Sequence, residues 1–196
     1  CRELVCRALL HHGLTMKATR RVWITGGSRG VGRGLVEAFV ESGYRVFTCA
    51  RRHPDQALTP GVGFTVADLR APDQAAAACE EAAAYLGGID LLINNAGGSP
   101  MVPADQASSS FSRKIIELNL LAPLYCATAA QAVMKTQPEG GQIINVASVS
   151  GQRPSPGTAA YGAAKAGLIH LTQSLAVEWA PALRVNAVAL GFVETP

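Results

Sequence analysis

The sequence is poor in charged and in aromatic residues, which make up 16% and 6% of its 196 positions. Its 17 lysines and arginines outnumber the 14 aspartates and glutamates only slightly, and no run of them is interleaved with aromatic residues. A surface that follows a nucleic-acid backbone needs clustered positive charge of that kind. We therefore expect no nucleic-acid partner.

The sequence also lacks long apolar runs and paired cysteines. No apolar run approaches the roughly 20 residues that span a bilayer, so no membrane segment is expected. The cysteines are odd in number, widely spaced and without a CxxC pair, which argues against a disulfide framework and a zinc site. A reducing cytoplasm fits this usage best. The five cysteines are Cys1, Cys6, Cys49, Cys79 and Cys126.

The length suits one domain, and a hydrophobic content of 48% supplies enough side chains for its core. Residues 1–16 carry arginine and histidine through their apolar stretch, which argues against a secretory signal. Met16 is an alternative start. We expect residues 1–16 to form an N-terminal extension, either upstream read-through or a disordered segment, and residues 17–196 to form the domain.

From Arg21 onward, short apolar runs alternate with segments rich in helix-forming residues. Runs such as LLIN and IINVA lack polar alternation, as strands covered on both faces do. Because βα crossovers are right-handed, this pattern predicts one doubly wound, Rossmann-type α/β domain with a parallel sheet of order 3-2-1-4-5-6. The expected strands are Arg21–Thr25, Arg45–Cys49, Gly63–Ala67, Ile89–Ile93, Gln142–Ala147 and Arg184–Ala189. The expected helices are Val31–Ser42, Pro72–Leu86, Ser108–Thr136 and Thr158–Trp179.

A glycine-rich turn directly follows the first expected strand and leads into an amphipathic helix. Glycine has no Cβ, so the backbone of such a turn can approach a pyrophosphate, and unpaired amides at the helix start attract the anion. An ordinary strand-to-helix connection is the alternative for a glycine-rich segment taken alone. The expected cofactor-binding positions of the turn are Gly26, Ser28, Arg29, Gly30, Val31 and Gly32.

The glycine spacing GxxxGxG resembles the short-chain dehydrogenase/reductase family rather than the common GxGxxG fingerprint. The resemblance covers residues 17–196 and is specific, since its motifs follow in order along the chain. It lies in the non-extended branch, similar to NADP-dependent members of the 3-oxoacyl reductase type. The matching positions are Asp68 and Leu69 after the third strand, the NNAG motif Asn94, Asn95, Ala96 and Gly97 after the fourth, and then Asn119, Ser148, Tyr161 and Lys165.

This resemblance implies an enzyme that transfers hydride between a nicotinamide and a carbonyl or alcohol substrate. In the family pattern, Tyr161 transfers the proton and Ser148 binds the substrate oxygen, with Ser150 a less favoured substitute. Lys165 also contacts the nicotinamide ribose, and Asn119 holds a water that links the lysine to solvent. The motif positions implied to contact the cofactor are Asp68, Leu69, Asn95, Ala96, Gly97, Tyr161 and Lys165.

The pairing of Tyr161 with Lys165 also has a chemical explanation. Four residues apart on a helix, their side chains share one face. A phenol is a poor base near neutral pH. A cation about 4 Å away stabilises a phenolate by roughly 4 kcal/mol at an effective dielectric near 20. A lone YxxxK is usually a surface pair, so the interpretation depends on Ser148 and the glycine turn.

The end of the second strand predicts which nicotinamide binds. A carboxylate there would accept hydrogen bonds from the ribose hydroxyls of NAD, whereas a basic residue accommodates a 2′-phosphate. Here the segment reads CARR, and Arg51 offers a fork of donors suited to phosphate. Arg29 can close on the same group. NADP(H) is favoured over NAD(H), with solvated surface arginines as the alternative.

Near its end the chain departs from the family pattern. The segment ALGFVET resembles PG-x-V-x-T, which implies nicotinamide contacts for Gly191, Val193 and Thr195, but Leu190 replaces the proline that would restrict the backbone. Resembling chains continue into a substrate lid, a seventh strand and an oligomer interface. We therefore expect a C-terminally truncated domain, and a homodimer or homotetramer at full length.

Two other functions compete with the oxidoreductase. A non-catalytic or inactive truncated nucleotide-binding module would bind cofactor without turnover, but it has no need for the Ser, Tyr and Lys set. A sugar-nucleotide epimerase would require a GxxGxxG turn and a longer substrate domain. The substrates compatible with the pattern are small ketones or alcohols and acyl thioesters, and the sequence favours none of them.

Overall fold

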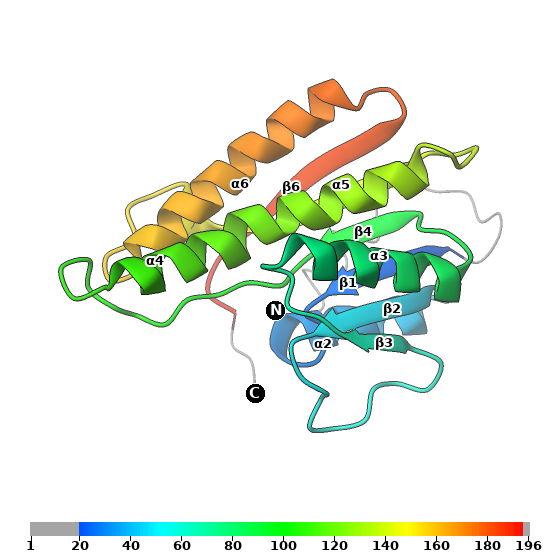
Figure 1. The fold of residues 1–196 in the computed structure, drawn as a ribbon, viewed down its shortest axis with the longest axis horizontal. Coiled ribbons are helices and arrows are strands. Elements are labelled where there is room, and N and C mark those ends of the chain that lie inside the picture. The colour runs from blue at the N-terminus through cyan, green and yellow to red at the C-terminus, as the bar shows by residue number, and fades with distance from the viewer. Residues whose placement is uncertain (1–19, 194–196) are drawn as a thin grey trace.

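Six apolar segments pair side by side into one parallel sheet in the computed structural model, which describes residues 20–193 (Figure 1). The sheet order is β3-β2-β1-β4-β5-β6, so the predicted fold class and strand order are confirmed. The strands are β1 (Arg21–Thr25), β2 (Arg45–Ala50), β3 (Gly63–Val66), β4 (Leu91–Asn94), β5 (Gly141–Ser148) and β6 (Leu183–Leu190).

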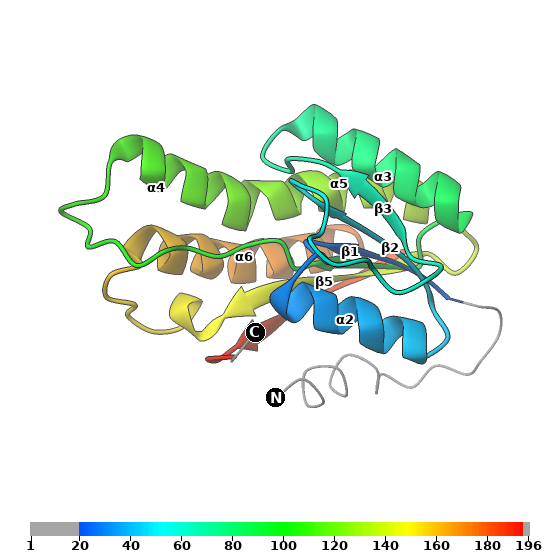
Figure 2. The same cartoon turned by 90° about the horizontal axis from the view of Figure 1, so that it is seen from below.

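Helices cover the two faces unequally. One helix, α2, lies on one face, and α3, α5 and α6 lie on the other (Figure 2). Successive residues of a strand point to opposite faces. Accordingly Val22 and Ile24 join the buried cluster under α2, while Trp23 joins the larger cluster under the other helices. The helices are α2 (Gly30–Glu41), α3 (Pro72–Leu86), α4 (Ser109–Ile116), α5 (Ala122–Met134) and α6 (Ala159–Glu178).

The single helix predicted over Ser108–Thr136 is wrong in its interior. A π-helical turn, η1 (Glu117–Leu121), separates α4 from α5. The whole stretch Ser109–Met134 is long and apolar enough, by length and composition alone, to cross a membrane. Eight of its residues are nevertheless buried in the domain, as in the core helix of a globular protein; they are Ile115, Asn119, Ala122, Pro123, Cys126, Ala127, Ala130 and Met134.

The fourth strand begins two residues later than predicted. The amide of Ile89 donates to Oε1 of Gln137 at 2.9 Å, and its carbonyl accepts from Nε2 of the same side chain at 2.8 Å. A side chain 48 residues away therefore replaces the ladder partner that a strand would offer. The sequence pattern around Ile89 carries no sign of this.

Candidate active site

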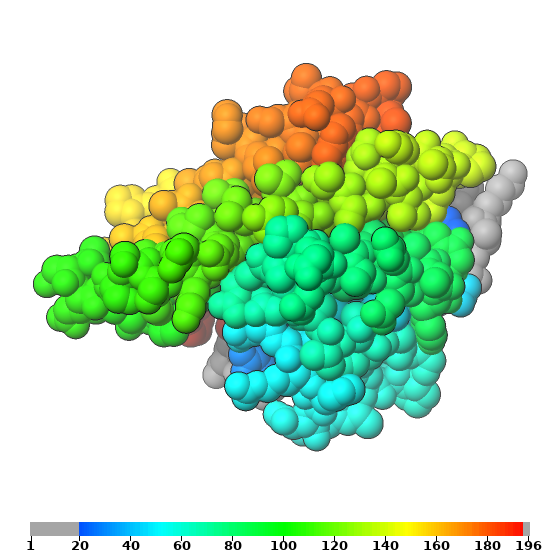
Figure 3. Space-filling model, in the orientation of Figure 1, coloured from blue at the N-terminus to red at the C-terminus, as the bar shows by residue number. Residues whose placement is uncertain are grey.

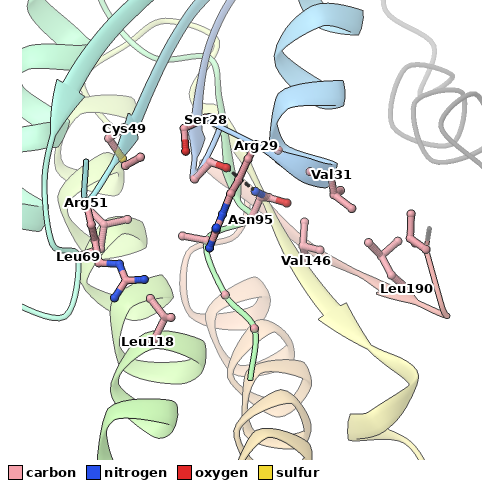
Figure 4. A pocket seen from close by; sticks show the side chains of 18 of the residues that line it. Ser28, Arg29, Val31, Cys49, Arg51, Leu69, Asn95, Leu118, Val146 and Leu190 are labelled. Carbon is pink, nitrogen blue, oxygen red and sulfur yellow. Dashed lines mark hydrogen bonds between the residues drawn. The ribbon is translucent and has the colours of Figure 1, made fainter. Parts of the chain in front are cut away.

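A cleft of about 690 Å³ runs along the carboxyl ends of the strands, where ligands bind in open α/β sheets (Figure 4). One end is formed by the glycine turn and by the residues that follow β2. The other end is formed by the last residues of β5, by Tyr161 and Lys165 of α6, and by Gly191 and Val193 beyond β6. The predicted positions that line it are Gly26, Ser28, Arg29, Gly30, Val31, Gly32, Arg51, Leu69, Asn95, Ala96, Gly97, Ser148, Tyr161, Lys165, Gly191 and Val193.

The glycine turn is held against the NNAG segment. Oγ1 of Thr25 accepts from the amides of Asn95 and Ala96, both at 3.0 Å. Nδ2 of Asn95 donates to the carbonyl of Thr25 at 2.9 Å. Gly26 has a φ of +73°, and a Cβ on Gly32 would lie 2.1 Å from the Gly26 carbonyl oxygen. The turn therefore keeps its shape only with glycine at both positions.

We expect Gly32→Ala to raise the dissociation constant for the cofactor at least about tenfold and to lower stability by about 1–3 kcal/mol, because backbone must move to accept the methyl group. Fluorescence titration and urea unfolding measure the two effects. Gly43→Ala is the matched control, since Gly43 also has a positive φ (+80°) but no atom within 4 Å of the place that a Cβ would take. Unchanged cofactor binding in Gly32→Ala would contradict the assignment of the turn.

Charge in the cleft is strongly one-sided. Its ionised lining residues are three arginines and a lysine against a single carboxylate, that of Asp55. The arginines are Arg29 in the turn and Arg51 after β2, both labelled in Figure 4, together with Arg52. Positive charge therefore gathers at one end. A thiol also lines this end, but burial raises the pKa of Cys49 to about 11 and keeps it protonated. This end of the cleft suits a polyanion.

Two predicted cofactor-binding positions, Asp68 and Thr195, are not among the described residues that line the cleft. Asp68 does not line the cleft, although its neighbours Ala67 and Leu69 do. The Arg70 guanidinium donates to both Asp68 carboxylate oxygens and holds the pKa of that carboxyl below its usual value. Thr195 lies outside the residues that the structure describes, as does the predicted extension over residues 1–16.

Lys165 is buried at the opposite end of the cleft, with 3% of its surface exposed. Its Nζ donates to the Val146 carbonyl of β5 at 2.7 Å and lies 5.7 Å from the centre of the Tyr161 ring. Burial lowers the pKa of Lys165 to about 8. The side chain can therefore exchange a proton near neutral pH.

Ser148 ends β5 and caps the short 3₁₀ turn η2 (Val149–Gly151). Its Oγ accepts from the amide of Ser150 at 3.1 Å. A hydroxyl has one proton to donate, and this bond uses only an acceptor site of the oxygen. The Ser148 proton is therefore left for a group in the cleft.

Asn119 lies in the π-helical turn and is fully buried. Its Nδ2 donates to the Ile115 carbonyl at 2.9 Å, and its Oδ1 accepts from the Gly98 amide at 2.8 Å. The side chain does not itself line the cleft but holds Gly98, which does. A Cβ on Gly97 would lie 2.7 Å from Oδ1 of Asn119 and 3.3 Å from Nζ of Lys165, so the three residues converge.

Twelve lining residues were not predicted from the sequence because they lie outside the recognised motifs, at the ends of strands, in connections or in the π-helical turn. The segment after β2 folds back over the cleft, and its basic residues in CARR were the only signal of that. Leu190 was noted only for the proline that it replaces. The missed residues are Cys49, Ala50, Arg52, His53, Pro54, Asp55, Ala67, Gly98, Leu118, Val146, Ala147 and Leu190.

An open parallel sheet with a glycine turn at its topological switch point defines a dinucleotide-binding α/β domain. Residues 20–196 match the family model described as short chain dehydrogenase. The chain therefore belongs to the short-chain dehydrogenase family. It is an oxidoreductase of the class that acts on alcohol or carbonyl groups with a nicotinamide dinucleotide, NAD(H) or NADP(H).

Curated relatives cover most of the chain. It is 32% identical over 185 residues to a Bacillus subtilis protein named "Probable 2,4-dienoyl-CoA reductase", covering 89% of this chain and 73% of that one. It is 34% identical over 180 residues to galactitol 2-dehydrogenase of Agrobacterium fabrum, covering 87% and 69%.

Solved structures share the fold. The ligand-free aldohexose dehydrogenase of Thermoplasma acidophilum superposes with a TM-score of 0.83 at 32% identity, covering 91% of this chain and 69% of that one. A tyrosine-to-phenylalanine variant of ElxO with NADPH bound superposes with a TM-score of 0.83 at 27% identity, covering 91% and 75%.

Proposed function

We propose that the protein is an NADP(H)-dependent oxidoreductase that interconverts a ketone and an alcohol, with Tyr161 as the general acid and base. The observation that carries the proposal is one continuous cleft with arginines at one end and Tyr161, Lys165 and Ser148 at the other. A dinucleotide is long enough to place its phosphates and its nicotinamide at opposite ends of such a cleft. Relatives are named for activity on sugars, polyols and acyl-CoA thioesters. We therefore propose to test two substrate classes, small ketones and β-keto thioesters.

The chain's own groups act on the substrate oxygen. When bound, the nicotinamide supplies the hydride for carbonyl reduction or takes it up from an alcohol. Ser148 donates the proton that its bond to Ser150 leaves free, and so orients the carbonyl oxygen. Tyr161 transfers its proton to that oxygen as negative charge develops. Lys165 stabilises the resulting phenolate by its charge, and Asn119 supports the backbone at Gly98 beside it.

The preference for NADP(H) is proposed from Arg29 and Arg51. Both residues are exposed and line the phosphate end, and no carboxylate follows β2 directly. Guanidinium forks bind phosphate oxygens in pairs. The NADPH found in a structural relative is consistent with this preference.

We expect Arg51→Ala to raise the dissociation constant for NADPH about 10- to 100-fold, since a hydrogen bond to a charged group contributes about 1.5–3 kcal/mol. The constant for NADH should change less than about threefold, because NADH lacks the 2′-phosphate. Nicotinamide fluorescence measures both. Arg113→Ala, which removes an exposed arginine of α4, should alter neither constant. Equal losses for the two cofactors would contradict the phosphate role.

The proposed activity is tested by titrating the protein with NADPH and with NADH, then adding ketones and β-keto thioesters to the same sample. Tight NADPH binding with ketone-dependent oxidation would establish the reductase. Binding without turnover across the panel would overturn the catalytic part of the proposal. Tighter binding of NADH would overturn the cofactor part.

A further inference from the structure

The connection between β2 and β3 supplies one wall of the phosphate end. Residues 51–62 form this connection, and Arg51, Arg52, His53, Pro54 and Asp55 line the cleft. Most of residues 51–57 are exposed, and the connection projects from the domain (cyan in Figures 1 and 3). An exposed segment with little packing needs other contacts to hold its side chains in place.

Arg33 of α2 makes two such contacts, in addition to the ring contact of His53 with Phe64 of β3, whose centroids lie 5.5 Å apart. Its NH1 donates to the Gln56 carbonyl at 3.1 Å, and its NH2 donates to the Ala57 carbonyl at 2.8 Å. Its Nε donates to Glu37, one turn along α2, at 3.0 Å, which orients the guanidinium. Within residues 20–193, the two bonds from Arg33 are the hydrogen bonds that join residues 51–57 to a helix or strand.

The position of Arg33 suits this task. It follows Gly32 directly, so its backbone is fixed by the same turn that receives the cofactor. Arg33 does not line the cleft. Its side chain instead joins the connection after β2 to the start of α2.

We propose that Arg33 is a positioning residue that latches residues 51–57 to α2 and so holds Arg51 and Arg52 ready for the 2′-phosphate of NADP(H). This inference rests on the proposed function, since it presumes that these arginines bind the phosphate. A planar fork reaches two successive carbonyls at once, whereas an ammonium group has no such geometry. The shape of the guanidinium matters here as well as its charge.

The proposal predicts a selective loss of affinity for ligands that carry the 2′-phosphate. When the binding-competent arrangement of a segment falls to about one-tenth of the population, the apparent dissociation constant rises about tenfold. We expect Arg33→Met to raise the constants for NADPH and for 2′,5′-ADP about 5- to 10-fold. The constant for NADH changes less than about twofold, because NADH makes no use of the phosphate contacts.

The test combines these titrations with limited trypsin digestion of the cofactor-free protein, which reports release of the segment by cleavage after Arg51 or Arg52. Arg33→Met removes the fork and the charge, Arg33→Lys keeps the charge, and Arg113→Met is the matched surface control. We expect both Arg33 variants to be cleaved about tenfold faster than the wild type and the control to be unchanged. Matching thermal unfolding curves establish that the variants are folded.

The outcomes separate the latch from the cofactor proposal. If the wild type prefers NADPH but both Arg33 variants keep its affinity and its cleavage rate, the latch is overturned. If Arg33→Lys behaves as the wild type while Arg33→Met loses NADPH affinity, charge alone acts and the latch is again overturned. If the wild type shows no preference for NADPH and no affinity for 2′,5′-ADP, the proposed cofactor is wrong, and accelerated cleavage would then support only the tethering of the segment.

Discussion

Tyr161→Phe is expected to lower kcat about 10²- to 10⁴-fold, because general acid catalysis contributes rate factors of that size. The substitution removes only the hydroxyl and leaves the ring in its place on α6 beside Lys165. NADPH binding should stay within about twofold of the wild-type value, since the glycine turn and arginines are untouched. Steady-state kinetics with the best ketone of the panel and a fluorescence titration measure the two quantities.

Tyr125→Phe is the matched control. Tyr125 lies on α5, is half-buried against the core, and does not line the cleft. Its loss of a hydroxyl should leave kcat unchanged. A Tyr161→Phe enzyme that keeps more than about a third of the wild-type kcat would remove Tyr161 from the acid and base role.

The strand order and much of the site could be predicted because both follow from regular chain geometry. Alternating βα units fix a parallel sheet, and a parallel sheet places every strand's carboxyl end at one edge. Ser148 at the end of β5 and Gly26 after β1 therefore meet in one cleft although they lie far apart in the sequence. The four-residue spacing of Tyr161 and Lys165 directed both side chains to that edge.

The remaining features depend on long-range contacts that leave no local pattern. The π-helical turn at Asn119 arises where its side chain bonds to the Ile115 carbonyl and to Gly98 of another segment. The wall formed by residues 51–57 depends on the reach of Arg33 from α2. Asp68 was expected at the cofactor, but its neighbour Arg70 pairs with its carboxylate. In each case a side chain selects a partner that the periodicity of the sequence does not encode.

Lys165→Met is expected to raise stability at pH 7 while it abolishes most of the activity. Burial lowers the pKa of Lys165 from 10.5 to about 8, so keeping the ammonium charged in the folded protein costs up to about 3 kcal/mol at 1.36 kcal/mol per pKa unit. Methionine fills similar space without the charge. It also loses the hydrogen bond to the Val146 carbonyl, which offsets about 1 kcal/mol. A net gain of about 1–2 kcal/mol remains.

The pH dependence of unfolding tests the cause of that gain. Below pH 8 the lysine is protonated in both states, and the full penalty of burial is present. Between about pH 8 and 10.5 the unfolded chain holds the proton more tightly, so the wild type gains stability as pH rises, and Lys165→Met lacks this gain. The difference in the free energy of urea unfolding between variant and wild type, measured without cofactor, should therefore shrink from pH 7 to pH 10.

A variant that is less stable at pH 7, with a difference independent of pH, would show that Lys165 carries no burial penalty. An activity loss together with a stability gain would instead mark Lys165 as a residue kept for chemistry at the expense of the fold.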